Sequence, residues 1–385
     1  MELNALPCDA PLSSYERQAA TLRRGWQSGD ATAIRVVRSR HPKFLDDKIV
    51  WLQRRLTDDE ARAIPIDEGD AKLALARWYD FYDWSKLEEY VASVRVPGPV
   101  QRFERAVDAI VSGDADLLSR LLRDDPDLVR ARSTRVNFFD PPHNRATLLH
   151  YLAANGVENY RQRSPANAVQ IAKILLDAGA DPNALQDSYG GQNTTLAMLV
   201  SSSHPREAGV LVPLVDTLID YGASVAPLGK GQCADPLMTA IVHGSLEAAL
   251  ALERRGARTD SLPAAAGLGR VEQARRMLPA ATPAERHSAL AVASQHGHTE
   301  VVLLLIAAGE DVNRFNPEGH HAHATPLHQA IANGHLDTAR FLVEHGARLD
   351  IKDRIFQSTP LGWADYCNQP AIAAYLRGRV TGESR

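Results

Sequence analysis

The sequence predicts an all-α solenoid: a row of short helix-turn-helix units with hairpin or loop fingers, preceded by a helical capping region. One observation is a spacing of glycines that recurs in several segments of the chain. A second is that apolar residues between those glycines recur at helical intervals. The third is size, since 385 residues with 44% apolar content are too many for one ordinary domain and too apolar for a disordered chain.

The repeat is clearest in three segments, which begin at Asp235, Ser288 and Thr325. A glycine stands nine residues after each start, and another follows 12 residues later. Glycine readily adopts the left-handed conformation that ends a helix, so each pair of glycines bounds two short helices. The glycines are Gly244 and Gly256, Gly297 and Gly309, and Gly334 and Gly346.

The segment from Thr325 shows why these residues form helices. The Thr325 hydroxyl can cap the first helix, and Pro326 suits a first turn in which its missing N–H costs nothing. In the second helix, Leu336, Ala339 and Leu342 lie on one face. We therefore expect each unit to bury one face against its neighbour.

These motifs resemble the ankyrin repeat. The resemblance lies in Thr-Pro-Leu-His at 325–328, Gly-His at 334–335 and Gly-Ala at 346–347, and Thr359-Pro-Leu begins another copy 34 residues on. Weaker copies bring the total to about eight between residues 102 and 380. The resemblance implies a non-catalytic scaffold whose concave face and hairpin tips bind another protein. It also implies that His150 and His328 each make a structural hydrogen bond that ties a helix start to the adjacent hairpin.

We expect a helical N-terminal region over 1–98, the repeat array over 99–380 and a short tail over 381–385. Gly29-Asp30 repeats the spacing of Gly113-Asp114 within a similar helical pattern, and the aromatic cluster 78–84 has the spacing of a packed core. Such helical leaders loosely resemble those of bacterial ankyrin proteins.

Two copies are longer than the pattern requires. Gly156 and Gly179 of the second copy are 23 residues apart, which places about 11 inserted residues near 157–168. The third copy is lengthened through His204 to Leu211. Because insertions in solenoids usually form exposed loops, we expect both to be recognition features.

Composition argues against several functions. A net charge of −4 offers no basic excess for nucleic acid. The three cysteines are too few and too far apart for a disulfide framework, which favours a reducing, cytoplasmic location. The longest strongly apolar run, Val301–Ala308, is eight residues, so neither a membrane span nor export is expected. No motif of a common enzyme class is present, and neither a catalytic residue nor a cofactor is predicted.

One finger, the segment NRFNPEGHHAHA over 313–324, carries residue types that can bind a metal or transfer a proton. Alternate residues of an extended stretch point the same way, as metal ligands or an acid and base pair need. Alternatively, 316–319 is a simple turn, and the histidines are solvated, touch the neighbouring finger or contact a partner. No cysteine lies nearby to complete a metal site. The candidate residues are Arg314, Phe315, Glu318, His320, His321 and His323.

Other fingers supply the remaining candidates for partner binding. Phe138 and Phe139 are anchors if exposed, but they could pack on a neighbouring loop. Tyr189 stands beside a glycine pair that allows either close approach of a partner or a plain hairpin turn. Further candidates are His143, Gln192 and Phe356.

Two functions follow. The favoured one is a non-catalytic scaffold that binds a protein partner. The alternative is a small-molecule-binding protein or enzyme that uses His320, His321 and His323 as acid, base or metal ligands.

Overall fold

The computed structural model of the chain describes residues 2–49, 51–139 and 141–382. These residues form two compact units. Unit 1 comprises Met1–Ser224 with Leu228–Ala234, and unit 2 comprises Val225–Pro227 with Asp235–Arg385. Both consist mainly of helices, which confirms the predicted all-α solenoid class. No helix within the described ranges is long and apolar enough to cross a membrane.

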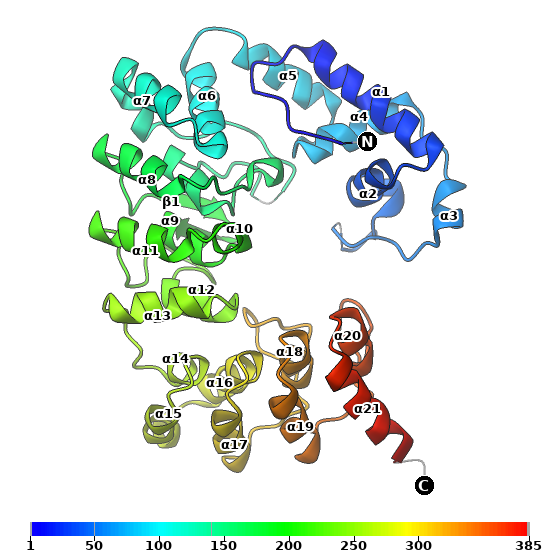
Figure 1. Cartoon of the computed structure of the whole chain (residues 1–385), viewed down its shortest axis with the longest axis vertical. Coiled ribbons are helices and arrows are strands. Elements are labelled where there is room, and N and C mark those ends of the chain that lie inside the picture. Colours follow the sequence, from blue (N-terminus) through cyan, green and yellow to red (C-terminus); the bar gives the residue numbers. More distant parts are fainter. Residues whose placement is uncertain (1, 50, 140, 383–385) are drawn as a thin grey trace. The chain divides into compact units, whose positions relative to one another are not determined.

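Unit 2 is a stack of helical hairpins (Figure 1). Along the stack, first helices pack on first helices, from α12 through α14, α16 and α18 to α20, and second helices pack on second helices from α15 through α17 and α19 to α21. The helix pairs are α12 (Pro236–Val242) and α13 (Leu246–Arg254), α14 (Leu262–Gly267) and α15 (Val271–Met277), α16 (Pro283–Gln295) and α17 (Thr299–Ala307), α18 (Pro326–Ala332) and α19 (Leu336–Glu344), and α20 (Pro360–Tyr366) and α21 (Pro370–Gly382). The short 3₁₀ helix η5 (Leu278–Ala280) follows α15.

The glycine between paired helices is needed for two reasons, as Gly297 shows. Its φ of 72° lies in the left-handed region that ends α16, where a side chain is strained. A Cβ at this position would also lie 2.5 Å from the His335 ring of the next repeat. The predicted turn therefore also sets how closely successive repeats approach.

Unit 1 contains three further helix pairs of the predicted array. They are α6 (Pro99–Ser112) with α7 (Ala115–Asp124), η3 (Leu148–Ala153) with α8 (Ala168–Asp177), and α9 (Thr195–Val200) with α11 (Leu211–Asp220). The first helix of the second pair is a 3₁₀ helix that ends at Ala154 with a φ of 48°. The remaining elements are η2 (Pro126–Arg130), η4 (Asn159–Arg161), α10 (Ser203–Glu207) and the antiparallel strands β1 (Leu185–Ser188) and β2 (Gly191–Thr194).

The N-terminal part of unit 1 has its own apolar cluster, built from side chains such as Tyr15, Leu22 and Leu75. Of the predicted aromatic core, Tyr79 and Phe81 are buried, whereas Tyr82 is 40% exposed. The boundary at residue 98 stays a prediction. The elements are α1 (Leu12–Ser28), α2 (Ala31–Arg40), η1 (Pro42–Phe44), α3 (Asp58–Arg62), α4 (Glu68–Trp78) and α5 (Trp84–Val94).

The insertion in the second copy is only partly exposed, contrary to the sequence-based expectation. Val157, Glu158 and Arg161 are buried, whereas Arg163 and Ala166 are exposed. The segment packs toward the N-terminal region, where the backbone N–H and the side-chain amide of Asn159 both donate to the buried carboxylate of Asp80. The buried residues of the insertion are therefore structural. The insertion in the third copy does present exposed residues, over 206–209.

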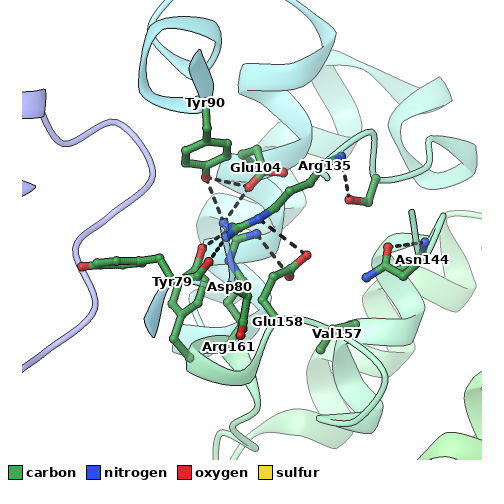
Figure 2. A network of polar contacts seen from close by, with 12 residues as sticks. Tyr79, Asp80, Tyr90, Glu104, Arg135, Asn144, Val157, Glu158 and Arg161 are labelled. Carbon is green, nitrogen blue, oxygen red and sulfur yellow. Dashed lines mark hydrogen bonds and ion pairs between the residues drawn. The ribbon is translucent and has the colours of Figure 1, made fainter. Parts of the chain in front are cut away.

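A network of buried charges surrounds this insertion (Figure 2). Arg161 Nη2 lies 2.6 Å from Glu104 Oε2, and Arg161 Nη1 lies 3.5 Å from Glu158 Oε2. Arg135 donates to the Tyr160 hydroxyl at 2.6 Å and to the Tyr79 carbonyl. Paired charges thus join the α6 helix to the insertion, and hydrogen bonds to Tyr79 and Tyr90 join the network to the N-terminal region.

Burial disfavours the charged forms of the side chains in this network, but the pairing of opposite charges offsets that free-energy cost. Burial alone would raise the pKa of Glu104, yet the guanidinium groups of Arg161 and Arg135 hold that pKa below its ordinary value. Removing one partner leaves the others buried and uncompensated, which costs far more than losing an exposed ion pair.

We predict that Arg161→Met lowers the free energy of unfolding of unit 1 by about 3–5 kcal/mol, because Glu104 and Glu158 lose their shared partner. Urea denaturation of the full chain, followed by tryptophan fluorescence, measures this loss. The exposed Arg163→Met is the matched control, with an expected change of about 0.5 kcal/mol or less. Adding Glu104→Gln to Arg161→Met should restore part of the loss. Equal stability of the two single variants would contradict the role assigned to the network.

Candidate functional site

The finger over 313–324, between α17 and α18 of unit 2, borders a depression of about 480 Å³. Its lining consists mainly of the finger's own polar and charged residues, together with one residue from α16 and one from the next finger. The lining residues are His287, Asn313, Arg314, Phe315, Asn316, Pro317, Glu318 and Arg354.

Local hydrogen bonds shape this finger. The Asn316 N–H donates to the Ala324 carbonyl at 2.8 Å and closes the loop, while the His320 N–H donates to the Pro317 carbonyl at 3.0 Å. Gly319 has a φ of 80°, and His321 has a φ of 60°. The turn that the sequence indicated at 316–319 is therefore present, and the backbone does not continue as the extended stretch needed to align alternate histidines.

Two of the three histidines of the finger lie together, with the His321 and His323 ring centroids 6.3 Å apart, and each of the three also has contacts of its own. His321 Nε2 donates to the Val242 carbonyl at the end of α12, at 3.1 Å. The His323 ring lies 5.9 Å from the Trp363 ring and 6.1 Å from Phe356, measured between ring centroids. His320 Nδ1 lies 3.2 Å from the Glu318 carbonyl. Within the described ranges, no group of three His, Cys, Asp or Glu side chains could hold a metal ion.

The next finger, over 348–358, lies directly beside the first. The Arg354 N–H donates to the His323 carbonyl at 2.9 Å, and its guanidinium carbon lies 4.2 Å from the Phe315 ring centroid. Asp353 organises this second finger by accepting from the Ser358 N–H at 2.9 Å and the Trp363 indole N–H at 3.0 Å. Burial would raise the pKa of Asp353, but these donors hold it below its ordinary value. Phe356 is 44% exposed on this finger.

The Tyr189 finger belongs to unit 1 and is a tight β-hairpin. Tyr189 and Gly190 both have positive φ, 51° and 69°, and join β1 to β2. The Tyr189 ring is 57% exposed, and its hydroxyl donates to the Asn155 side-chain carbonyl. The plain hairpin turn is thus present, with an aromatic ring at its tip.

A second loop supports this hairpin, and the sequence analysis did not identify it. Gln192 and Lys230 exchange backbone hydrogen bonds of 2.8 and 3.1 Å. A Cβ on Gly191 would lie 2.1 Å from the Lys230 carbonyl, so this close approach requires glycine. The two glycines that flank Lys230 were the available signal. The Gln192 side chain itself is exposed.

Phe138 and Phe139 are half-buried in unit 1, and His143 is exposed. The Phe138 N–H donates to the Asp80 carbonyl at 2.7 Å, and the Arg77 guanidinium lies 4.4 Å from its ring centroid. Phe138 therefore packs against the N-terminal region, a different neighbour from the repeat loop considered in the sequence analysis.

The histidines expected to be structural do hold helix ends. Thr147 and Thr325 each contact the Nδ1 of the histidine three residues later, His150 or His328, at 2.8 Å from the hydroxyl oxygen. His328 Nε2 also donates to the Ser358 carbonyl of the next finger at 3.4 Å, which confirms for His328 the tie to the adjacent hairpin that the family resemblance implied. For His150 this tie stays a prediction.

Other ring N–H groups reach carbonyls at the ends of earlier first helices. His298 donates to Gly267 at 3.0 Å, and His335 donates to Gln295 at 2.9 Å. These carbonyls belong to helix ends that lack partners within their own helix.

Comparisons with known proteins agree with this architecture. Models of ankyrin repeats match residues 144–187, 287–343 and 316–381. Over 127 residues the chain is 32% identical to human cyclin-dependent kinase inhibitor 2A, and the aligned region covers 32% of this chain and 79% of that protein. It is 35% identical over 63 residues to the ankyrin repeat-containing protein P1E11.10 of Schizosaccharomyces pombe, and the aligned region covers 16% of this chain and 28% of that protein.

The chain belongs to the ankyrin repeat family. Ankyrin repeats indicate a protein-interaction scaffold in general, and the family is typically non-catalytic.

Burial makes unit 2 sensitive to acid. It lowers the pKa of His328 to about 4, below the value of about 6.5 for an unfolded chain. Above pH 6.5 both states are neutral and the stabilising contribution is complete. As the pH falls from 6.5 toward 4, the unfolded state binds a proton that the folded state excludes, so stability is lost.

We predict that His328→Gln reduces this loss by about 1 kcal/mol per pH unit between pH 6 and 4.5, because one titrating group is removed. Urea denaturation at several pH values, followed by the fluorescence of Trp363 in variants that lack the other tryptophans, measures the slope. The Trp363 ring lies 5.1 Å from His328 and reports on this repeat. Identical slopes for the two proteins would contradict the prediction.

Proposed function

We propose that this protein is a non-catalytic recognition scaffold that binds a protein partner through the first helices and fingers of its repeats. The main observation that supports this proposal is that finger tips present large aromatic residues to solvent, with Tyr189 57% exposed and Phe356 44% exposed. Aromatic side chains are enriched among the residues that dominate binding energy at protein interfaces. The fingers also carry exposed polar groups suited to an interface rim, including Gln192, Arg314 and Glu318.

The contacts of the histidines favour this function over chemistry. His321 donates to a backbone carbonyl, and His323 packs against aromatic rings. These contacts assign both side chains to holding the finger in shape. We therefore treat His320, His321, His323, Phe138 and Phe139 as supports of the binding surface, and the exposed residues as its contacts.

The relatives fit a scaffold in general terms. One is named as an inhibitor of a cyclin-dependent kinase, which is a protein target. We carry over only that mode of action, the binding of another protein. A net charge of −4 favours a protein partner over a nucleic acid. Neither Cys8 nor Cys367 forms a disulfide, which supports the cytoplasmic location that we propose.

We predict that a photo-reactive phenylalanine analogue placed at Tyr189 or Phe356 cross-links to a discrete protein in the cells that naturally produce this chain. The analogue keeps an aromatic ring at each exposed tip, so it can meet the partner without disturbing the fold. Gel electrophoresis and mass spectrometry of the adduct provide the measurement.

The matched control is the same analogue at Tyr366, which is 92% exposed at the end of α20 and belongs to no finger. We expect Tyr189→Ala and Phe356→Ala to lower the recovered adduct or complex about tenfold, with little change in thermal stability. Equal cross-linking from all three positions, or none from the finger positions, would refute the proposed surface.

A further inference from the structure

The depression beside the 313–324 finger is lined by two arginines and one glutamate, which leaves a net positive charge. Arg314 and Arg354 both line it, and both side chains are exposed. Within the described part of the chain, neither guanidinium has a carboxylate oxygen within 4.0 Å, whereas Arg348 and Arg286 of the same unit are each paired with an acid. Glu318 contributes the one carboxylate among the residues that line the depression.

The two arginines are held in place by different means. The Arg354 guanidinium lies over the Phe315 ring at 4.2 Å, and its Nη1 donates to the Ala322 carbonyl at 3.4 Å. Arg314 follows a turn in which its N–H donates to the Asp311 carbonyl at 3.3 Å. Its charge also acts on the neighbouring His287, because the pKa of His287 is lowered mainly by burial and to a smaller extent by the Arg314 guanidinium. The fingers therefore present at least one guanidinium in a restricted orientation.

A buried amide also stands in the lining of this depression. Asn316 is only 3% exposed, and both polar atoms of its side chain lack a hydrogen-bond partner among the described residues. A buried amide without a partner is unfavourable, so the floor of the depression is polar. A carboxylate can accept from two guanidinium groups at the same time.

We infer that this depression binds an acidic side chain, aspartate or glutamate, from an extended segment of the protein partner, with its carboxylate between Arg314 and Arg354. The inference rests on the proposed function and adds to it the chemistry that the partner must carry. Charge complementarity selects the acidic residue, because guanidinium groups bind carboxylates through paired, charge-assisted hydrogen bonds. The Phe315 ring adds an apolar surface for the neighbouring residue of that segment.

The probe is a phage-displayed library of random 12-residue peptides, selected on the full chain. We expect an enriched sequence pattern with at least one aspartate or glutamate next to an apolar residue. Fluorescence anisotropy then gives the dissociation constant of an enriched peptide and of its isosteric Asp→Asn or Glu→Gln form. The acidic form should bind about tenfold more tightly, and raising the salt concentration should reduce this difference.

Charge-only variants of the protein localise the effect. Arg314→Gln and Arg354→Gln should each weaken binding of the acidic peptide about tenfold, whereas Glu318→Gln should strengthen it about twofold by removing a like charge. The control is Arg276→Gln, an exposed arginine on α15 that does not line the depression, for which we expect no change. Thermal unfolding of each variant verifies that the fold is retained.

Several results would overturn this inference. They are a library that yields no binder, an enriched pattern without acidic residues, equal affinity for the acidic and amide peptides, or equal weakening by Arg276→Gln and Arg354→Gln. Cross-linking at Tyr189 and Phe356 could still succeed in each of these cases. The failure of the inference is therefore distinguishable from the failure of the proposed scaffold function.

Discussion

The structure depends on the fact that a single helical hairpin of about 20 residues can neither bury its apolar face nor pair all of its own backbone polar groups. Its apolar face needs a neighbour, and the last carbonyls of each helix have no partner within that helix. In unit 2 both needs are met by adjacent repeats. Apolar faces stack, while ring N–H groups of His298 and His335 reach the ends of α14 and α16. These two histidines therefore serve the repeat-to-repeat contact, which explains why their rings are half-buried.

Unit 1 meets the same needs at a greater free-energy cost, because it buries charged side chains. Its second repeat begins with a 3₁₀ helix, and the insertion that follows carries Glu158 and Arg161 into the interior. There, buried carboxylates and guanidinium groups compensate one another, together with Glu104 and Arg135. Charged side chains in such a place are tolerated only in matched sets. The network thus makes the N-terminal region and the first repeats dependent on each other, because disturbing one side exposes unpaired charge on the other.

The sequence predicted the repeat well because its signals are local. Helix starts, left-handed glycines and apolar periodicity depend on neighbours within a few residues, and the turn at 316–319 was indicated in the same way. The errors concern contacts between distant segments. The insertion near 157–168 was expected to be exposed, because nothing in its own sequence shows that Asp80 accepts hydrogen bonds from Asn159. Likewise, the approach of Arg354 to Phe315 spans two repeats and leaves no local pattern.

The hydrogen bond from the Arg354 N–H to the His323 carbonyl also affects how a partner is recognised. It ties one finger to the backbone of the next, so the two loops cannot sample conformations independently. Much of the conformational entropy that loose loops lose on complex formation has then already been lost during folding. A partner meets a preformed contour, and its residence time should depend more on how well its own side chains fit than on any reshaping of this chain.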